Sequence, residues 1–136
     1  MTNNIVTPNE NEIKIRQLVE NWAGAVRKRD LQNILAYHSH DIVMYDVPKP
    51  FQSIGMDAYS KTWDTFFAYT KPGVFDIQEL TIFADNSIAF CFAAMKCADK
   101  SNSADYVELD FRLTIGLKKI NDQWIIVHEH HSIPSE

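Results

Sequence analysis

The second half of the chain reads as four consecutive β-strands, and this pattern constrains the fold more than any other feature of the sequence. Strands are predicted over residues 74–83, 88–98, 106–120 and 124–132. Asp85-Asn86 and Asn121-Asp122 are typical of tight turns between strands. Strands joined by tight turns pair antiparallel, so we expect a single antiparallel meander.

Two of these strands differ in the spacing of their apolar residues. Residues 106–120 alternate, with an apolar face that runs from Val107 to Leu117 and a polar face that carries Asp110 and Arg112. Residues 88–98 are almost continuously apolar, which predicts a strand that is covered on both faces.

Helices are predicted in the first half of the chain. Apolar residues recur at helical spacing from about Asn9 to Arg29, and shorter helices are expected from Leu31 to about His38 and from about Met56 to Tyr69. Helices followed by a meander predict an α+β fold. We expect a curved antiparallel sheet wrapped around the N-terminal helices, with a cone-shaped cavity between the two layers and an outer sheet face that forms a homodimer.

Length and charge limit the classes of function. The chain has 136 residues and a formal net charge of -5, so we predict a single domain over residues 10–136 after a disordered lead-in over residues 1–9. No cluster of Lys and Arg points to a nucleic-acid partner. No apolar run reaches membrane-spanning length, and the first residues lack the features of a signal peptide. A cytoplasmic protein with no membrane partner is therefore expected.

The two cysteines, Cys91 and Cys97, fall on one predicted strand. Six residues of extended chain separate them by about 20 Å, which is beyond the reach of a disulfide. We expect both to be buried, reduced thiols.

The last predicted strand, Trp124–Ser132, begins with apolar residues and ends with three histidines and a glutamate. Regular alternation places His128 and His130 on the face of Trp124, pointing into the cavity, and places Glu129 and His131 on the opposite face. His128 and His130 are then candidates for acid–base groups or for zinc ligands. No motif supplies a third ligand, so no metal site is predicted.

The remaining histidines are assigned to solvent. His131 is expected to be exposed or at an interface, and His38 and His40 are expected to lie in a loop between a helix and a strand.

Four local patterns follow one another along the chain. They are Arg29-Asp30-Leu31 with Tyr37-His-Ser-His-Asp41, then Tyr45-Asp46-Val47-Pro48, then Gly55-Met-Asp-Ala-Tyr59, and last Arg112-Leu-Thr114 with Asn121-Asp-Gln-Trp124. Together they resemble the SnoaL-like and ketosteroid-isomerase-like families of the nuclear transport factor 2 fold, from roughly Ile13 to Pro134. This fold hosts isomerases, cyclases, dehydratases and non-enzymatic binders.

The resemblance to the isomerases singles out Asp46 as a general base. The alternative is that this carboxylate only caps the turn before Pro48. Trp22 matches the position of the family's oxyanion-hole tyrosine, and Gly116 matches that of its protonated aspartate. Both of those groups are absent here, so steroid isomerisation itself is not expected.

The resemblance also implies that Arg112 lines the cavity, because an arginine before a threonine does so in several relatives. Asp110, on the same face, is a second candidate, and the alternative for both is a solvated outer face. Trp63 is expected to line the cavity and to orient a ligand through its N–H group.

These residues predict a small-molecule-binding protein. If it is an enzyme, we expect a cofactor-free catalyst of the isomerase, cyclase or dehydratase type that acts on an apolar carbonyl compound. Asp46 or His128 would be the base, and Arg112 or Trp22 would stabilise the oxyanion. The alternative is a non-enzymatic ligand-sensing or assembly domain that recognises a small carboxylate through Arg112.

Overall fold

The computed structural model describes residues 9–100 and 105–135, which form three helices and six strands. The elements are α1 (Glu10–Lys28), α2 (Leu31–Leu35), β1 (His38–Tyr45), β2 (Ser53–Ile54), α3 (Met56–Tyr69), β3 (Thr70–Ala84), β4 (Ile88–Asp99), β5 (Val107–Ile120) and β6 (Gln123–Ser132). The predicted lead-in, apart from Asn9, lies outside the described residues. The short strand β2 was not predicted, and His38, which was expected in a loop, is the first residue of β1.

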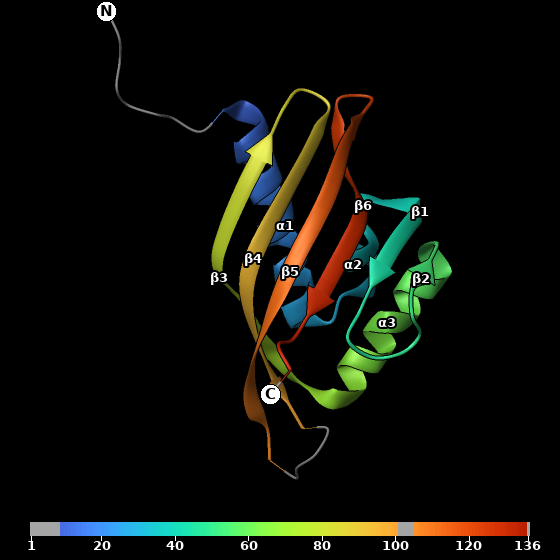
Figure 1. Ribbon diagram of the computed structural model, residues 1–136, viewed down its shortest axis with the longest axis vertical. Helices are drawn as coiled ribbons and strands as arrows, with labels where there is room; N and C mark the ends of the chain where they lie inside the picture. Colours follow the sequence, from blue (N-terminus) through green and yellow to red (C-terminus); the bar gives the residue numbers. More distant parts are fainter. Residues whose placement is uncertain (1–8, 101–104, 136) are drawn as a thin grey trace, which may run out of the picture.

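The strands form one curved sheet with the order β2-β1-β6-β5-β4-β3. The pairs from β3 to β6 are antiparallel, whereas β1 runs parallel to β6. The helices pack against one face of this sheet and leave the other face uncovered (Figure 1). The prediction of an α+β fold with a curved sheet around N-terminal helices is confirmed.

Helix α1 is held at both ends by local interactions. The side chain of Asn9 accepts a hydrogen bond from the backbone N–H of Glu12, which satisfies one of the free donors of the first turn. At the other end Arg29 adopts a left-handed conformation, with φ 55°. Its guanidinium donates to the carbonyl oxygens of Phe67 and Thr70, at 2.7 and 2.6 Å, and so fixes α1 to the end of α3.

A β-bulge interrupts β6 and decides which of its side chains enter the core. Leu117 pairs with Ile126, but the preceding residue Gly116 pairs with His128, so Val127 is one residue more than β5 can match. An extra residue reverses the alternation of faces beyond it. Ile126 points into the core before the bulge, and Glu129 points there after it. The predicted common inner face of Trp124, His128 and His130 is therefore wrong.

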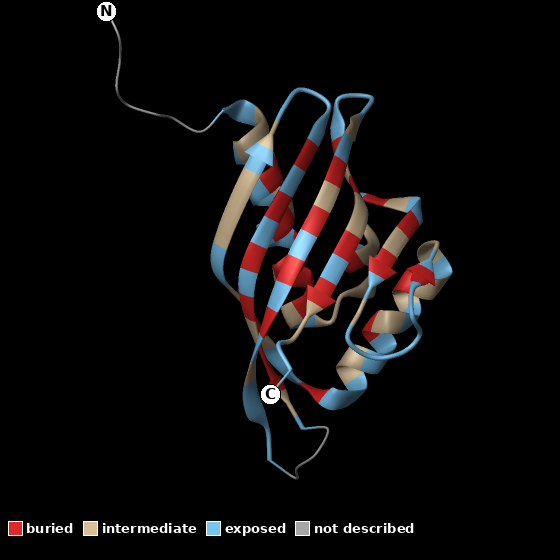
Figure 2. Cartoon of the chain, in the orientation of Figure 1, coloured by how far each residue is buried: buried red, intermediate tan, exposed pale blue. Residues whose placement is uncertain are grey.

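Strand β4 alternates between buried and exposed residues (Figure 2). Its inner face includes Cys91 and Cys97, which are buried and free, as predicted. Burial raises the pKa of each thiol to about 12. Phe90 and Phe92, on its outer face, are 49% and 45% exposed. The prediction that this strand is covered on both faces is wrong for the single chain, because the helices pack on one side only.

Within the described part of the chain, no helix is both long enough and apolar enough to cross a membrane.

Replacing Ile126 by alanine should destabilise the fold strongly, because its side chain is fully buried next to the bulge. Loss of this volume should lower the free energy of unfolding by about 2–5 kcal/mol. The matched control is Ile120→Ala, at an exposed position of β5, where we expect a loss of less than about 1 kcal/mol. Urea unfolding measures both values, and equal losses would contradict the placement of Ile126.

Candidate functional site

A cavity of about 260 Å³ opens where the end of α3 meets the C-terminal end of β6. Its walls are mainly apolar. They include Val47, Phe66, Leu109, Phe111 and Ile133. Asp46 and His131 are among the polar groups of this lining, and the described lining residues contain no Lys or Arg. A smaller hollow of about 150 Å³ shares Asp46 with this cavity and is lined by Lys49 and Lys61.

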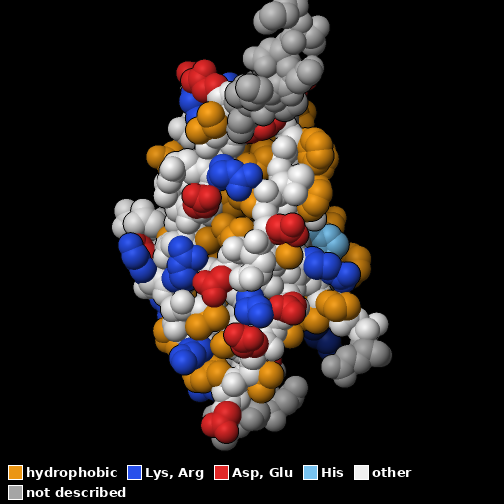
Figure 3. All heavy atoms as spheres, turned by 90° about the vertical axis from the view of Figure 1, so that its left-hand side faces the viewer, with side chains coloured by type: hydrophobic (Ala, Val, Ile, Leu, Met, Phe, Trp, Pro, Cys, Tyr) orange, Lys and Arg blue, Asp and Glu red, His pale blue; other side chains and the backbone are white. Residues whose placement is uncertain are grey.

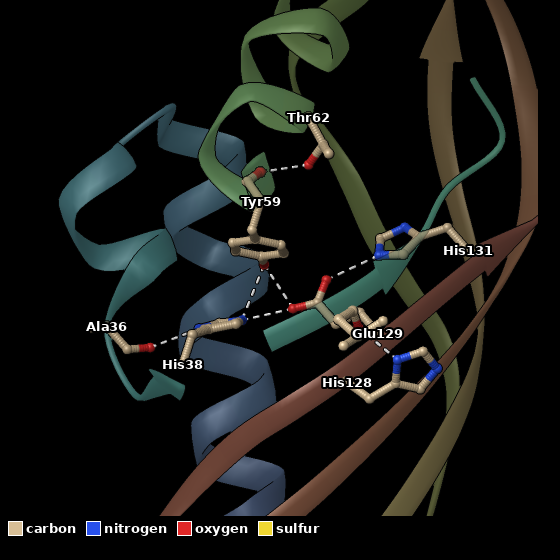
Figure 4. A network of polar contacts seen from close by, with 8 residues as sticks. Ala36, His38, Tyr59, Thr62, His128, Glu129 and His131 are labelled. Atoms are coloured by element: carbon tan, nitrogen blue, oxygen red, sulfur yellow. Dashed lines mark hydrogen bonds and ion pairs between the residues drawn. The ribbon is translucent and has the colours of Figure 1, made fainter. Parts of the chain in front are cut away.

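Behind the cavity, a buried network converges on the carboxylate of Glu129, whose side chain is 0% exposed. His131 Nε2 lies 3.0 Å from Glu129 Oε1. His38 Nε2 and the hydroxyl of Tyr59 each lie 2.6 Å from Glu129 Oε2. Figure 4 shows these three side chains directed at Glu129, which they reach from β6, β1 and α3.

The hydrogen-bond partners define where the protons lie. His38 Nδ1 is 2.9 Å from the carbonyl oxygen of Ala36, which can only accept, so Nδ1 carries a proton. The Tyr59 hydroxyl donates its single proton to Glu129. The short contact between His38 Nε2 and Glu129 therefore needs a proton of its own, and His38 and Glu129 form a buried, charge-assisted pair.

The network shifts two pKa values. Burial alone would raise the pKa of Glu129, but hydrogen bonds from His131 and His38, with the charges of these residues, lower it to about 2. Burial raises the pKa of Tyr59 well above its ordinary value, and the charge of Glu129 raises it further. Glu129 is thus a carboxylate and Tyr59 a neutral donor at neutral pH.

His131 connects this network to the cavity. In the neutral form of this ring, a proton on Nε2, which faces Glu129, leaves Nδ1 with the lone pair. Nδ1 has no hydrogen-bond partner among the described residues, and His131 lines the cavity. The ring of Phe111 stacks on the imidazole, at 5.9 Å between centroids and 7° between planes. His131 is thereby an imidazole that is held in place, lines the cavity, and has no hydrogen bond on Nδ1 within the described residues.

Among the predicted site residues, Asp46 is the one that lines this cavity. It is half-buried, and its Oδ1 accepts a hydrogen bond from the backbone N–H of Val47 at 2.8 Å. This hydrogen bond supports the interpretation of Asp46 as a turn cap. The general-base role of Asp46 stays a prediction.

The predicted placement of four other residues is wrong, because they lie on the outer face of the sheet. Asp110 and Arg112 are exposed, with Asp110 near Lys96 and Arg112 donating to the hydroxyl of Ser132. His128 is half-buried and His130 is exposed. The bulge turned the two histidines outward, and the polar face of β5 is simply the face without helices. The structure therefore does not support the cavity roles predicted for these four residues.

Trp22 and Trp63 belong to the core rather than to the cavity lining. They are 3% and 2% exposed, with ring centroids 5.8 Å apart. Neither indole N–H has a hydrogen-bond partner within the described residues. Both rings contact His131 edge-on, at 6.4 and 6.2 Å between centroids, and so restrict its orientation.

Sequence reasoning missed the buried network of His38, Tyr59, Glu129 and His131. It placed His38 in a solvent-facing loop and His131 at an exposed or interface position, and both are buried, whereas His40 is exposed, as expected. One signal pointed to the error. A glycine within an otherwise apolar strand, here Gly116, often marks a bulge, and a bulge opposite Gly116 reverses every assignment after Val127.

The comparisons with known proteins agree with this fold. Residues 15–136 match the family model of the SnoaL-like domain. An NTF2-like protein of unknown function from Pseudomonas putida KT2440 is 32% identical, with a TM-score of 0.83, over 96% of this chain and 92% of that chain. A search of curated proteins finds no match.

Two further solved structures share the fold at lower identity. A ketosteroid isomerase-like protein from Erwinia carotovora atroseptica SCRI1043 is 17% identical, with a TM-score of 0.77, over 95% of this chain and 100% of that chain. A protein of unknown function with a cystatin-like fold from Nostoc punctiforme PCC 73102 is 14% identical, with a TM-score of 0.73, over 95% and 98%.

The lowered pKa of Glu129 predicts a loss of stability in acid. Its value falls from 4.5 to about 2 on folding, so the stabilisation is complete above pH 4.5 and disappears as the pH falls towards 2. The shift corresponds to roughly 3 kcal/mol. Glu129→Gln should lack this pH dependence and should be less stable at pH 7 by about 3–5 kcal/mol, because two buried histidines lose their partner.

The control is Glu108→Gln, which removes an exposed partner of Lys96 and should change the stability by no more than about 1 kcal/mol. Urea unfolding between pH 2 and 7 measures all three proteins. The same pH dependence in wild type and Glu129→Gln would show that Glu129 is not the ionised centre of the network.

Proposed function

The chain belongs to the SnoaL-like domain family, and from this premise we propose that it binds a small neutral, mainly apolar carbonyl compound and catalyses proton transfer on it without a cofactor. The observation that supports the proposal is the His131–Glu129 pair: His131 lines an apolar cavity, Glu129 holds its Nε2, and its Nδ1 has no hydrogen bond within the described residues. A histidine oriented by a carboxylate is a common general base.

The cavity supports a compact, uncharged ligand. Its volume of about 260 Å³ lies near the lower limit for small-molecule sites, about 300 Å³. Apolar side chains form most of the wall, and Phe66 and Phe111 offer ring faces to a cyclic compound.

The proposed step begins when His131 Nδ1 takes a proton from the carbon next to the carbonyl group. The electron pair of that C–H bond moves into an enolate, and Glu129 stabilises the imidazolium that forms. The proton then returns to another carbon of the same conjugated system, either from His131 or by way of Asp46. The described lining offers hydroxyl groups such as that of Tyr69 to the enolate oxygen, but no cation, so we expect a modest rate.

The alternative, a non-catalytic domain that recognises a carboxylate, has less support. It depended on Arg112 as the partner of the anion, and Arg112 is exposed on the far face of the sheet. Asp46 in the cavity lining would repel a carboxylate.

We also propose that two copies associate through the outer face of the sheet. Phe83, Phe90 and Phe92 stack there, with ring centroids 5.2 to 6.5 Å apart, and all three are exposed in the single chain. Figure 3, which views the β3 edge, shows hydrophobic side chains gathered along the margin that belongs to this outer face. An exposed apolar patch of this kind is typical of an interaction surface.

The catalytic proposal is tested by hydrogen exchange at carbon. The protein is incubated with 2-tetralone in D₂O, and NMR follows deuterium entry next to the carbonyl group. We expect wild type to accelerate this exchange, and His131→Gln to lower the acceleration by about 10²–10⁴-fold, because glutamine cannot act as a base.

His40→Gln is the matched control, because His40 is exposed and outside the network, and it should exchange at the wild-type rate. Binding of the ketone is followed separately by saturation-transfer NMR. Unchanged exchange in His131→Gln would contradict the assignment of the base. Binding without any exchange by wild type would favour the non-catalytic alternative.

The dimer is tested by sedimentation velocity. Phe90→Glu places a charge in the centre of the phenylalanine patch and should convert a wild-type dimer to monomer. Ile13→Glu, an exposed position on α1, should leave the dimer intact. A monomeric wild-type protein, or a dimeric Phe90→Glu variant, would contradict the interface.

A further inference from the structure

We propose that the two copies of the dimer pack about a two-fold axis that runs along β4, so that Arg112 of each copy forms an ion pair with Glu79 of the other copy. The inference rests on the proposed association through the outer face of the sheet and is independent of the proposed catalysis. It names the contacts that make this face fit a second copy of the same chain.

The pairing of the strands places Glu79 and Arg112 in one row across the outer face, on either side of β4. Ala94 of β4 pairs with Glu79 on β3 and with Arg112 on β5. Neighbouring strands lie about 4.8 Å apart, so the backbones of the two charged residues are about 10 Å apart. Between them stands only the methyl group of Ala94, and all three residues line a hollow of about 390 Å³.

Both charged groups lack an ion-pair partner within their own chain. Glu79 and Arg112 are exposed, and neither takes part in an ion pair among the described residues. Arg112 donates from Nε to the hydroxyl of Ser132 at 3.1 Å, which leaves its two terminal nitrogens for a carboxylate. Each copy therefore offers one unpaired anion and one unpaired cation at defined places on the same face.

A two-fold axis along β4 exchanges β3 and β5 across the interface. Each residue of β3 then lies against the β5 residue in the same row of the second copy, and the reverse contact is identical. Glu79 meets Arg112, and Arg112 meets Glu79, so one dimer contains two equal ion pairs. Phe83 belongs to the row of Phe90 and Gly116. Its ring meets Gly116 of the second copy, where no side chain obstructs it.

The opposite end of the phenylalanine patch repeats this pattern of charge. Ile88 of β4 pairs with Lys118 on β5. The carbonyl oxygen of Ile88 accepts a hydrogen bond from the backbone N–H of Asp85, at 3.0 Å, directly after β3. The same axis therefore brings Asp85 close to Lys118 of the second copy, so that opposite charges meet at both ends of the patch.

A neighbouring position of the axis fits the charges less well. A two-fold axis along β5 would place Arg112 against Arg112 and Lys118 against Lys118 of the second copy, and like charges in contact oppose association. The sheet curves around the helices (Figure 1), so its outer face is convex and two copies touch only over its middle rows. The row that contains Lys96 and Asp110, whose charges pair within the chain, lies beyond this contact.

Reversal of the two charges tests the pairing. Glu79→Arg leaves only cations at this contact in its own dimer, and Arg112→Glu leaves only anions. Each variant alone should weaken dimer formation by roughly 10²-fold or more, which sedimentation velocity over a concentration series measures. An equimolar mixture of the two variants should restore dimer formation to near the wild-type level, because every contact then joins a cation to an anion. Native mass spectrometry should show that the restored species contains one copy of each variant.

The matched control is Glu20→Arg, which reverses an exposed charge on α1 and should dimerise as wild type does. Far-UV circular dichroism checks that every variant is folded. Wild-type dimer formation by both single variants, or a mixture that stays monomeric while wild type is dimeric, would overturn the pairing and leave the proposed interface standing. A monomeric wild-type protein would overturn the interface itself, and the pairing with it.

Discussion

A carboxylate that is completely withdrawn from water must find all its hydrogen bonds within the protein, and the arrangement of this fold around Glu129 follows from that requirement. Removing the charge from water without partners would cost several kcal/mol. Here β1 supplies His38, α3 supplies Tyr59 and β6 supplies His131. The carboxylate therefore ties the helical layer to two strands of the sheet, and it fixes the position of α3 above the cavity.

The same interaction fixes His131, the histidine among the described residues that line the cavity. His131 has its orientation set by Glu129 on one side and by the ring of Phe111 on another. An imidazole held in this way keeps one nitrogen available without the entropy loss of ordering it when a ligand arrives. Structural stability and candidate chemistry consequently depend on the same buried charge, whose pKa is lowered to about 2.

The elements of the fold could be predicted from periodicity and turn residues, and helix α3 was predicted with its observed bounds, Met56–Tyr69. The candidate site could not, because its residues depend on a face assignment that one inserted residue reverses. Ile126 and Glu129 both point inward although regular alternation places them on opposite faces. The spacing of residues along β6 does not reveal that Val127 is an extra residue. Only the pairing of β6 with β5 shows it.

The burial of His38 could not be predicted for a similar reason. Its neighbours in sequence suggest a polar loop, but its environment is set by Glu129, 91 residues further along the chain. Asp46 could be expected at the cavity only through the resemblance to the isomerases, and it does line the cavity. Arg112 could not, because the strand alternation that put it opposite the apolar face does not say which face the helices cover.

The bulge at Val127 places Glu129 and His131 inside and His128 and His130 outside. Exchange of the histidine C2 hydrogen for deuterium, read residue by residue by tandem mass spectrometry, tests it directly, because buried imidazoles exchange slowly. We expect rapid exchange at His130 and strong protection at His131 and His38. Protection of His130 together with rapid exchange at His131 would contradict it.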